Sequence, residues 1–159
     1  MLSPQYRCLF VIILCCGLVS VSCAAEKSAS PGMPEAGLIA CPDSPNCVSS
    51  DAQDEKHHIA PLTFSIPAAE AWQLLKEQVA KLPRTVVVTD KPGYLHAECR
   101  SAVFGFVDDL EFQLRAAQGV IAVRSAARTG YYDFGANRQR IEELRAALRF
   151  GETIPNNEQ

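Results

Sequence analysis

Apolar and polar residues alternate between residues 103 and 115, and this alternation predicts a β-strand, because successive side chains of a strand lie on opposite faces. The apolar residues of one parity are Phe104, Phe106, Leu110, Phe112 and Leu114. Asp108 has the same parity and is therefore predicted to point toward the core, whereas Asp109 and Glu111 fall on the other face. A buried carboxylate is costly unless it is paired, so we expect basic or amide partners for Asp108.

Candidate partners for the inward carboxylate lie in the two elements that follow it in the chain. One is a second predicted strand over residues 120–128, and the other is a helix that begins near residue 137. We expect the basic and amide side chains of these elements to meet Asp108 in one polar cluster. Its predicted members are Asp108, Asp109, Glu111, Arg124, Arg128, Asp133, Asn137 and Arg138. A bulge in the strand at Asp108 and Asp109 would turn one carboxylate away and remove the argument from parity.

Two helices are predicted from apolar residues that recur every three or four positions. The first covers Ala68–Leu82, follows Ser65 as its expected N-cap and stops before a proline; the second covers Asn137–Leu148. Strands are predicted over residues 85–89, 94–100, 103–115 and 120–128, with turn residues between them. We therefore predict an α+β domain, in which a mostly antiparallel sheet of four to five strands carries two helices packed on one face.

The chain begins with a segment that has the build of a signal peptide. Residues 8–21 are apolar apart from one serine, and they follow a basic residue; the run is too short for a comfortable membrane span. Ser20-Val21-Ser22-Cys23 resembles a bacterial lipobox, although a larger aliphatic residue is usual where Ser20 stands. We expect lipidation of Cys23. The alternative is ordinary secretion, with cleavage one or two residues later.

These features divide the chain into four parts. We assign residues 1–23 to the signal peptide, residues 24–40 to a flexible linker, residues 41–150 to a single α+β domain and residues 151–159 to a polar tail. The linker is rich in Ser, Pro, Gly and Ala without apolar periodicity, so it cannot build a core. We expect an exported protein, in the periplasm or attached to the outer membrane of the cell envelope by its lipid anchor.

Three of the seven cysteines belong to the predicted domain. Cys41 and Cys47 enclose a short loop with two prolines, and an exported protein tolerates disulfides, so we expect these two residues to pair. A metal site is one alternative, but no further cysteine or suitably spaced histidine lies nearby. A redox-active pair is another, with a spacing unlike that of thioredoxin-like motifs. Cys99 shares a strand face with Leu95 and Ala97, and we expect it to be buried.

Charge and composition exclude some classes of function. The 159 residues carry a net charge of -3 with a pI of about 5.6, and acidic residues interleave with the arginines of residues 124–149, so we expect no nucleic-acid partner. No glycine-rich phosphate loop, nucleophile elbow or HExxH motif is present, and we expect no cofactor and no metal. His57 and His58 follow an acidic loop, where we expect both to be solvated.

Three stretches together resemble one family. They are CPDSPNCVSS at residues 41–50, FGFVDDLEF at residues 104–112 and RSAARTGYYDFGANRQRIEELR at residues 124–145. In this order they are similar to the domain of unknown function 1499 family, over about Cys41 to Leu148. Family members often have serine where Ala127 stands, and Tyr132 and Ala136 are variants of the usual pattern. The resemblance implies a compact domain of an envelope or organelle protein, and it implies no established activity.

Two functions remain open for this chain. The first is a non-enzymatic envelope module, whose polar cluster is structural or binds an unknown envelope protein or small ligand, together with the loop Tyr131-Tyr132-Asp133-Phe134. Alternatively, Tyr131 and Phe134 pack on the end of the sheet. The second is a hydrolase for an anionic substrate, with Asp108 or Asp109 as acid or base and arginines that hold the substrate. No histidine is expected near the cluster, and we favour the module over the enzyme.

Overall fold

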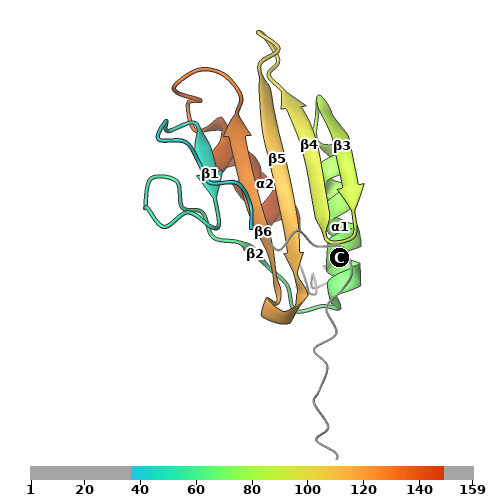
Figure 1. Ribbon diagram of the computed structural model, residues 1–159. Helices are drawn as coiled ribbons and strands as arrows, with labels where there is room; N and C mark the ends of the chain where they lie inside the picture. The colour runs from blue at the N-terminus through green and yellow to red at the C-terminus, as the bar shows by residue number, and fades with distance from the viewer. Residues whose placement is uncertain (1–36, 149–159) are drawn as a thin grey trace, which may run out of the picture.

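The structure, a computed structural model, describes residues 37–148 (Figure 1). The elements in chain order are β1 (Cys47–Ser49), β2 (Leu62–Thr63), α1 (Ala68–Lys81), β3 (Thr85–Lys91), β4 (Tyr94–Arg100), β5 (Val107–Arg115), η1 (Ala116–Gln118), β6 (Val120–Ala127) and α2 (Ala136–Ala147). The predicted signal peptide, Cys23, most of the linker and the polar tail lie outside the described residues. No helix within residues 37–148 is long and apolar enough to cross a membrane.

The strands form one antiparallel sheet, in the order β1-β6-β5-β4-β3, with β2 also paired to β6. The predicted α+β class is therefore confirmed. The sheet has six strands rather than four or five, because β1 and β2 are too short to show an alternating pattern. Each pairs with a separate part of β6: Val48 faces Ser125, and Leu62 faces Ile121.

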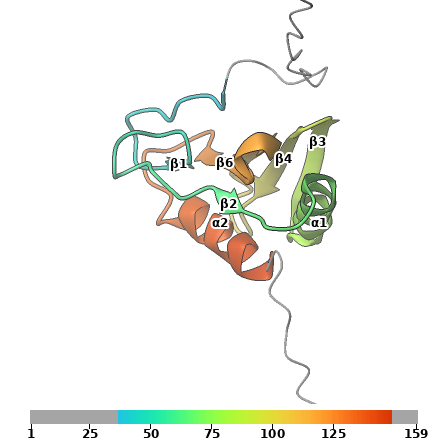
Figure 2. The ribbon, with the colours of Figure 1, turned by 90° about the horizontal axis from the view of Figure 1, so that it is seen from below.

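Both helices cover the same face of the sheet, as predicted (Figure 2). The core lies between them and the sheet, and its residues include Leu75, Val79, Leu95, Leu110, Phe112, Ile121, Ile141 and Leu144. Leu110 and Phe112 of β5 are fully buried there, which is the face that the alternation predicted for them. The burial of these apolar side chains is the main favourable contribution to folding.

The strand that carries Asp108, β5, begins later in the chain than the alternation of apolar and polar residues predicts. β5 starts at Val107, whereas Phe104 and Phe106 are 76% and 55% exposed, so their predicted place in the core is wrong. Between β4 and β5 the chain closes a turn, in which the Ser101 N–H donates to the Phe106 carbonyl and the Phe106 N–H donates to the Ser101 Oγ. Gly105 takes a φ of +66° in this turn, a value that favours glycine. The pairing of the two strands therefore stops before it reaches either phenylalanine.

The first helix starts at Ala68, and its N-cap is Pro67 rather than the predicted Ser65. The N–H groups of Glu70 and Ala71 donate to the Pro67 carbonyl, whereas the side chain of Pro67 makes no cap hydrogen bond. At the other end, Leu82 leaves the helix in an extended conformation just before a proline, as expected from the restriction that proline places on the residue before it.

The edge of the sheet opposite β1 is β3, which pairs only with β4. Its register shifts between Val87 and Thr89, where a bulge interrupts the ladder. The three valines over residues 86–88 are all exposed. This edge strand therefore exposes three apolar side chains, and its pairing is irregular.

Cysteine and histidine positions follow the predictions in part. Cys41 and Cys47 form a disulfide, with their Cα atoms 5.7 Å apart, and Cys99 is buried and free. His57, in contrast, is buried rather than solvated. Its Nδ1 lies 2.7 Å from Asp54 Oδ1, and its Nε2 lies 3.1 Å from the Ser44 carbonyl oxygen. These contacts, which spacing alone does not reveal, satisfy the ring and allow its burial.

The disulfide yields a stability prediction. Reduction should lower the free energy of unfolding of the native chain by about 2 kcal/mol, because a closed loop of this length restricts the unfolded state by roughly that amount. Urea unfolding with and without a reductant measures the difference. The Cys41→Ser/Cys47→Ser double variant should show no effect of reductant, and an undiminished effect in that variant would contradict the assignment to this bond.

Candidate functional site

Asp108 lies on the helix-covered face of the sheet, next to α2. Its side chain is 14% exposed, and its Oδ2 accepts a hydrogen bond of 2.7 Å from Nη2 of Arg140. Arg140 also donates through Nη1 to Ser125 Oγ at 2.9 Å and to Asn137 Oδ1 at 2.8 Å. The inward carboxylate is therefore neutralised by a guanidinium from the helix that covers it, and not by Arg124, Arg128 or Arg138.

Asn137 is the centre of this network on the helix face, and it is fully buried. Its Oδ1 accepts a 2.6 Å hydrogen bond from the Ser125 hydroxyl, and its Nδ2 donates to the Asn46 carbonyl at 3.1 Å and to Asp133 Oδ2 at 2.9 Å. One side chain thus joins the start of α2 to β6 and to the segment before β1. Every polar atom of the Asn137 amide has a partner, which offsets the cost of its burial.

A second network covers the opposite face of the sheet. Glu111 of β5 is buried, with Oε1 accepting a 2.7 Å hydrogen bond from the Tyr94 hydroxyl and Oε2 lying 2.8 Å from Arg124 Nη1. Burial, together with the Glu111 carboxylate, raises the pKa of Tyr94. Among the described residues, Arg124 Nε is buried without a hydrogen-bond partner. Glu111 therefore anchors side chains from both neighbouring strands.

Asp109 continues the network on this open face. Its carboxylate accepts hydrogen bonds from Arg128 Nε at 3.0 Å and Nη2 at 2.7 Å, and it lies 2.7 Å from His96 Nε2. Arg128 also reaches Glu98 Oε1 at 2.7 Å. The Arg128 hydrogen bonds, followed by the one to His96, hold the pKa of Asp109 below its usual value against the opposing effect of burial. The carboxylate is therefore charged at neutral pH.

The predicted polar cluster is thus divided between two faces. Asp108 and Asn137 lie on the helix face, whereas Asp109, Glu111, Arg124 and Arg128 lie on the open face. Arg138 belongs to neither network, since it donates to the carbonyls of Lys56 and His58. Asp133 caps the start of α2 and meets Asp108 only through Asn137 and Arg140.

The members of these networks that were not predicted include Tyr94, His96, Glu98 and Arg140. His96 lies directly opposite Glu111 in the β4–β5 ladder, and Glu98 lies directly opposite Asp109. Once this register is known, the alternation of side chains along β4 predicts that His96 and Glu98 lie on the same face as the two acidic residues of β5. Arg140 lies three residues after Asn137, which is one helical turn. The expectation that no histidine lies near the cluster is wrong.

The loops at one end of the sheet carry exposed apolar side chains. They connect β4 to β5 and β6 to α2, and both are seen at the upper end of Figure 1. We call this surface the aromatic tip; its residues are Val103, Phe104, Phe106, Tyr131, Tyr132 and Phe134. Tyr131 is 73% exposed and Phe134 is 90% exposed. The alternative in which these two residues pack on the end of the sheet is therefore wrong.

The second loop of the aromatic tip is held in place from both ends. Asn46 Nδ2 donates to the Gly130 carbonyl at 2.7 Å. Asp133 accepts the Gly135 N–H through Oδ1 and the Asn137 N–H through Oδ2, each at 3.0 Å. Between these points Phe134 takes a φ of +56°, a left-handed conformation that costs free energy for a residue with a side chain. The fold therefore holds the backbone of Phe134 in a strained conformation, with the aromatic ring exposed.

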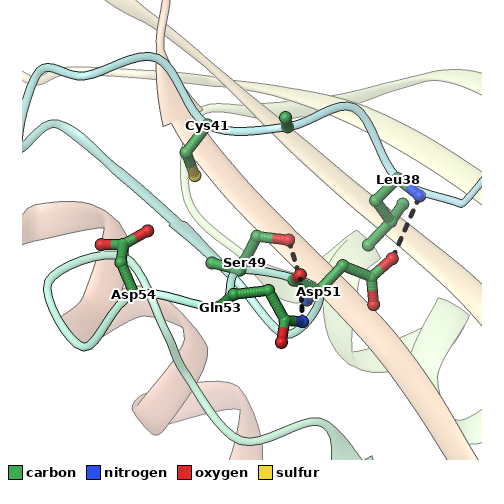
Figure 3. A pocket seen from close by; sticks show the side chains of 8 residues that line it. Leu38, Cys41, Ser49, Asp51, Gln53 and Asp54 are labelled. Atoms are coloured by element: carbon green, nitrogen blue, oxygen red, sulfur yellow. Dashed lines mark hydrogen bonds between the residues drawn. The ribbon is translucent and has the colours of Figure 1, made fainter.

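A pocket of about 250 Å³ lies away from the tip, between the segment before β1 and the loop after it (Figure 3). Asp51 and Asp54 are the charged residues in its lining. Arg115 binds the Asp51 carboxylate through two hydrogen bonds of 2.8 and 2.6 Å, and the Leu38 N–H donates to it at 3.3 Å. Leu38, from the predicted linker, is thus in contact with the domain. Within residues 37–148 no group of three or more His, Cys, Asp or Glu side chains is arranged to hold a metal ion.

Comparison with known proteins identifies a family for this domain. The family model described as "Protein of unknown function (DUF1499)" matches residues 37–148, which are the residues that the structure describes and which contain the whole sheet and both helices. No curated protein matches the chain. The comparisons therefore identify a family for the domain, but they indicate no activity.

The two faces differ in the stability that their arginines should contribute. Arg140→Ala leaves the largely buried Asp108 carboxylate without its guanidinium, and we expect a loss of about 3 kcal/mol in the free energy of unfolding. Arg128→Ala removes a more exposed partner and should cost much less. Urea unfolding of both variants measures the contrast. The Asp108→Asn/Arg140→Ala double variant should lose less unfolding free energy than the sum of the losses in the two single variants. Strictly additive losses would contradict a direct interaction between Asp108 and Arg140.

The acid stability of the domain should depend on Asp51. The Arg115 hydrogen bonds hold the pKa of Asp51 below its usual value of 3.8, so the ionised carboxylate stabilises the folded state above that pH. This stabilisation is lost as the pH falls through the lowered pKa. Asp51→Asn should therefore show a weaker decline of unfolding free energy between about pH 5 and pH 2 than the native chain. Urea unfolding across this range tests it, and parallel curves for the two proteins would be inconsistent with the pairing.

Proposed function

The chain belongs to the DUF1499 family, and from the geometry of its own residues we propose that it is a non-enzymatic binding module of the cell envelope. Its binding surface is the aromatic tip. The observation that carries the proposal is Phe134, a ring that is 90% exposed on a backbone held in the left-handed region. Strain of this kind persists only where the surrounding structure imposes it, and it is concentrated at functional sites.

The burial pattern supports a role for the tip outside folding. The core beneath the helices contains none of the six tip side chains. Large exposed apolar groups that gather in one place, rather than singly, are typical of interaction sites. Aromatic residues also contribute disproportionately to binding energy in protein interfaces.

The polar networks support a structural role for the charged residues. Asp108, Asp109 and Glu111 each lie within 3.0 Å of an arginine nitrogen, and each of the three pairs links two different elements of the fold. A general base works best with a pKa near the operating pH, whereas the pKa of Asp109 is lowered. This favours the binding module over the hydrolase, for which Asp109 was a candidate.

The envelope location rests on features of the sequence and on the disulfide. The apolar segment over residues 8–21 and the lipobox-like Cys23 support export and anchoring. The Cys41–Cys47 bond supports an oxidising compartment, because such bonds are rare in the reducing cytosol. A domain held beside the membrane by the residues that follow Cys23 is then in a position to use its tip.

Thiol accessibility in envelope membranes tests the proposal. In a Phe134→Cys variant of the full chain, maleimide should react about tenfold more slowly in isolated envelope membranes than in the purified protein, because an occupied tip excludes the reagent. The matched control is Gln118→Cys, an exposed position in η1 at the other end of the sheet, where the rates should agree. The native chain, which lacks the added cysteine, gives the background rate of reaction with maleimide. Equal rates for Phe134→Cys in the two preparations would exclude occupancy of the tip.

A further inference from the structure

The aromatic tip is almost free of charge. The loop over residues 101–106 contains no Asp, Glu, Lys, Arg or His, and of these residue types the loop over residues 129–135 contains only Asp133. Both oxygens of Asp133 accept hydrogen bonds from the start of α2. The groups that the tip presents to its surroundings are therefore aromatic rings, one valine and two tyrosine hydroxyl groups.

The two loops project from the same end of the sheet (Figure 1). They enter β5 and leave β6, which are neighbours in the sheet, so they start from the same end of it; in Figure 1 the β4–β5 turn stands highest and the loop after β6 bends toward β1. Within each loop the rings contact one another: the centroids of Phe104 and Phe106 lie 5.6 Å apart, and those of Tyr132 and Phe134 lie 5.1 Å apart. Projecting pairs of rings suit insertion into a soft surface better than they suit the packed core of a protein interface, which requires a complementary pocket for each anchor.

Arginines surround the base of the projections. Arg84 Nε donates to the carbonyl of Arg100, the last residue of β4, and Arg128 follows the end of β6, with its N–H bound to the Val107 carbonyl. Arg100 pairs there with the carboxylate of Glu98, and Arg128 pairs with the carboxylates of Glu98 and Asp109. Basic groups behind an apolar end match the anionic headgroups of a lipid bilayer, and tyrosine and related aromatic residues gather at the same depth.

The length of chain before the domain allows the tip to reach a membrane. Residues 24–36 separate Cys23 from the described part of the chain, and their maximal span is about 43 Å at about 3.3 Å per residue. The longest strand, β5, is about 30 Å long by the usual rise per residue. An anchor at Cys23 is therefore compatible with the tip end of the sheet lying against the bilayer.

We infer that the occupant of the aromatic tip is the lipid surface itself, with the rings of both loops at the level of the headgroups. The inference rests on the proposed binding function of the tip and adds the class of its partner. The lipid anchor then restricts the domain to the membrane, and the tip fixes its orientation there.

Quenching by brominated lipids tests this orientation in the full chain. A Phe134→Trp variant is reconstituted into vesicles of phosphatidylcholine and phosphatidylglycerol, with and without bromine on the acyl chains. The matched control is Gln118→Trp, at the opposite end of the sheet, and the native chain corrects for Trp72, which is buried in the core. Because the N-terminal segment is identical in all three proteins, its own association with lipid does not distinguish them. Equal unfolding midpoints show that the variants fold alike.

We expect about threefold stronger quenching at position 134 than at position 118, because an interfacial side chain lies several ångström inside the headgroup boundary. Equal quenching at the two positions would overturn the inference. If the thiol at position 134 is protected in envelope membranes while the tryptophan there is not quenched in vesicles, the occupant is a protein: the lipid inference fails and the proposed binding function stands. If neither effect is seen, both fail.

Discussion

The rest of the structure depends on the neutralisation of one carboxylate on the covered face of the sheet. Asp108 occupies a position where an apolar residue would serve the core, and it is stabilised there only by a guanidinium from the covering helix. Arg140 can reach it because Asn137, one turn earlier, ties the start of α2 to β6. The pair thereby fixes the position of the helix along the sheet, a kind of specificity for which buried polar groups are retained in some proteins.

The same network extends from the core to the aromatic tip. Asn137 binds Asp133, and the Asp133 carboxylate holds the backbone that follows Phe134, at Gly135 and Asn137. Asn46, whose carbonyl accepts from Asn137, fixes the beginning of that loop through Gly130. A loop restrained in this way loses little conformational freedom on binding, which is the usual benefit of preorganisation. The buried polar residues and the loop with the exposed aromatic residues are therefore connected by one network of hydrogen bonds.

Sequence patterns predicted the class of fold, the helices, the disulfide and the inward direction of Asp108, because each depends on local periodicity or on spacing. The pairing of charges could not be predicted in the same way. Opposite parity separates Asp108 from Asp109, but only the register of β4 and β5 brings His96 and Glu98 to the open face. Phe104 was misplaced for a related reason, since its parity continues into a turn in which the backbone no longer follows the strand.

The bulged edge of the sheet has a consequence for the proposed attachment of the domain to a membrane. The proposed anchoring would raise the local concentration of the domain, and the exposed valines of β3 would then favour edge-to-edge stacking of copies into extended ribbons. The shift of register between Val87 and Thr89 breaks the regular row of backbone donors and acceptors that such stacking requires. With the proposed membrane anchor, copies of the domain would therefore remain separate on one bilayer.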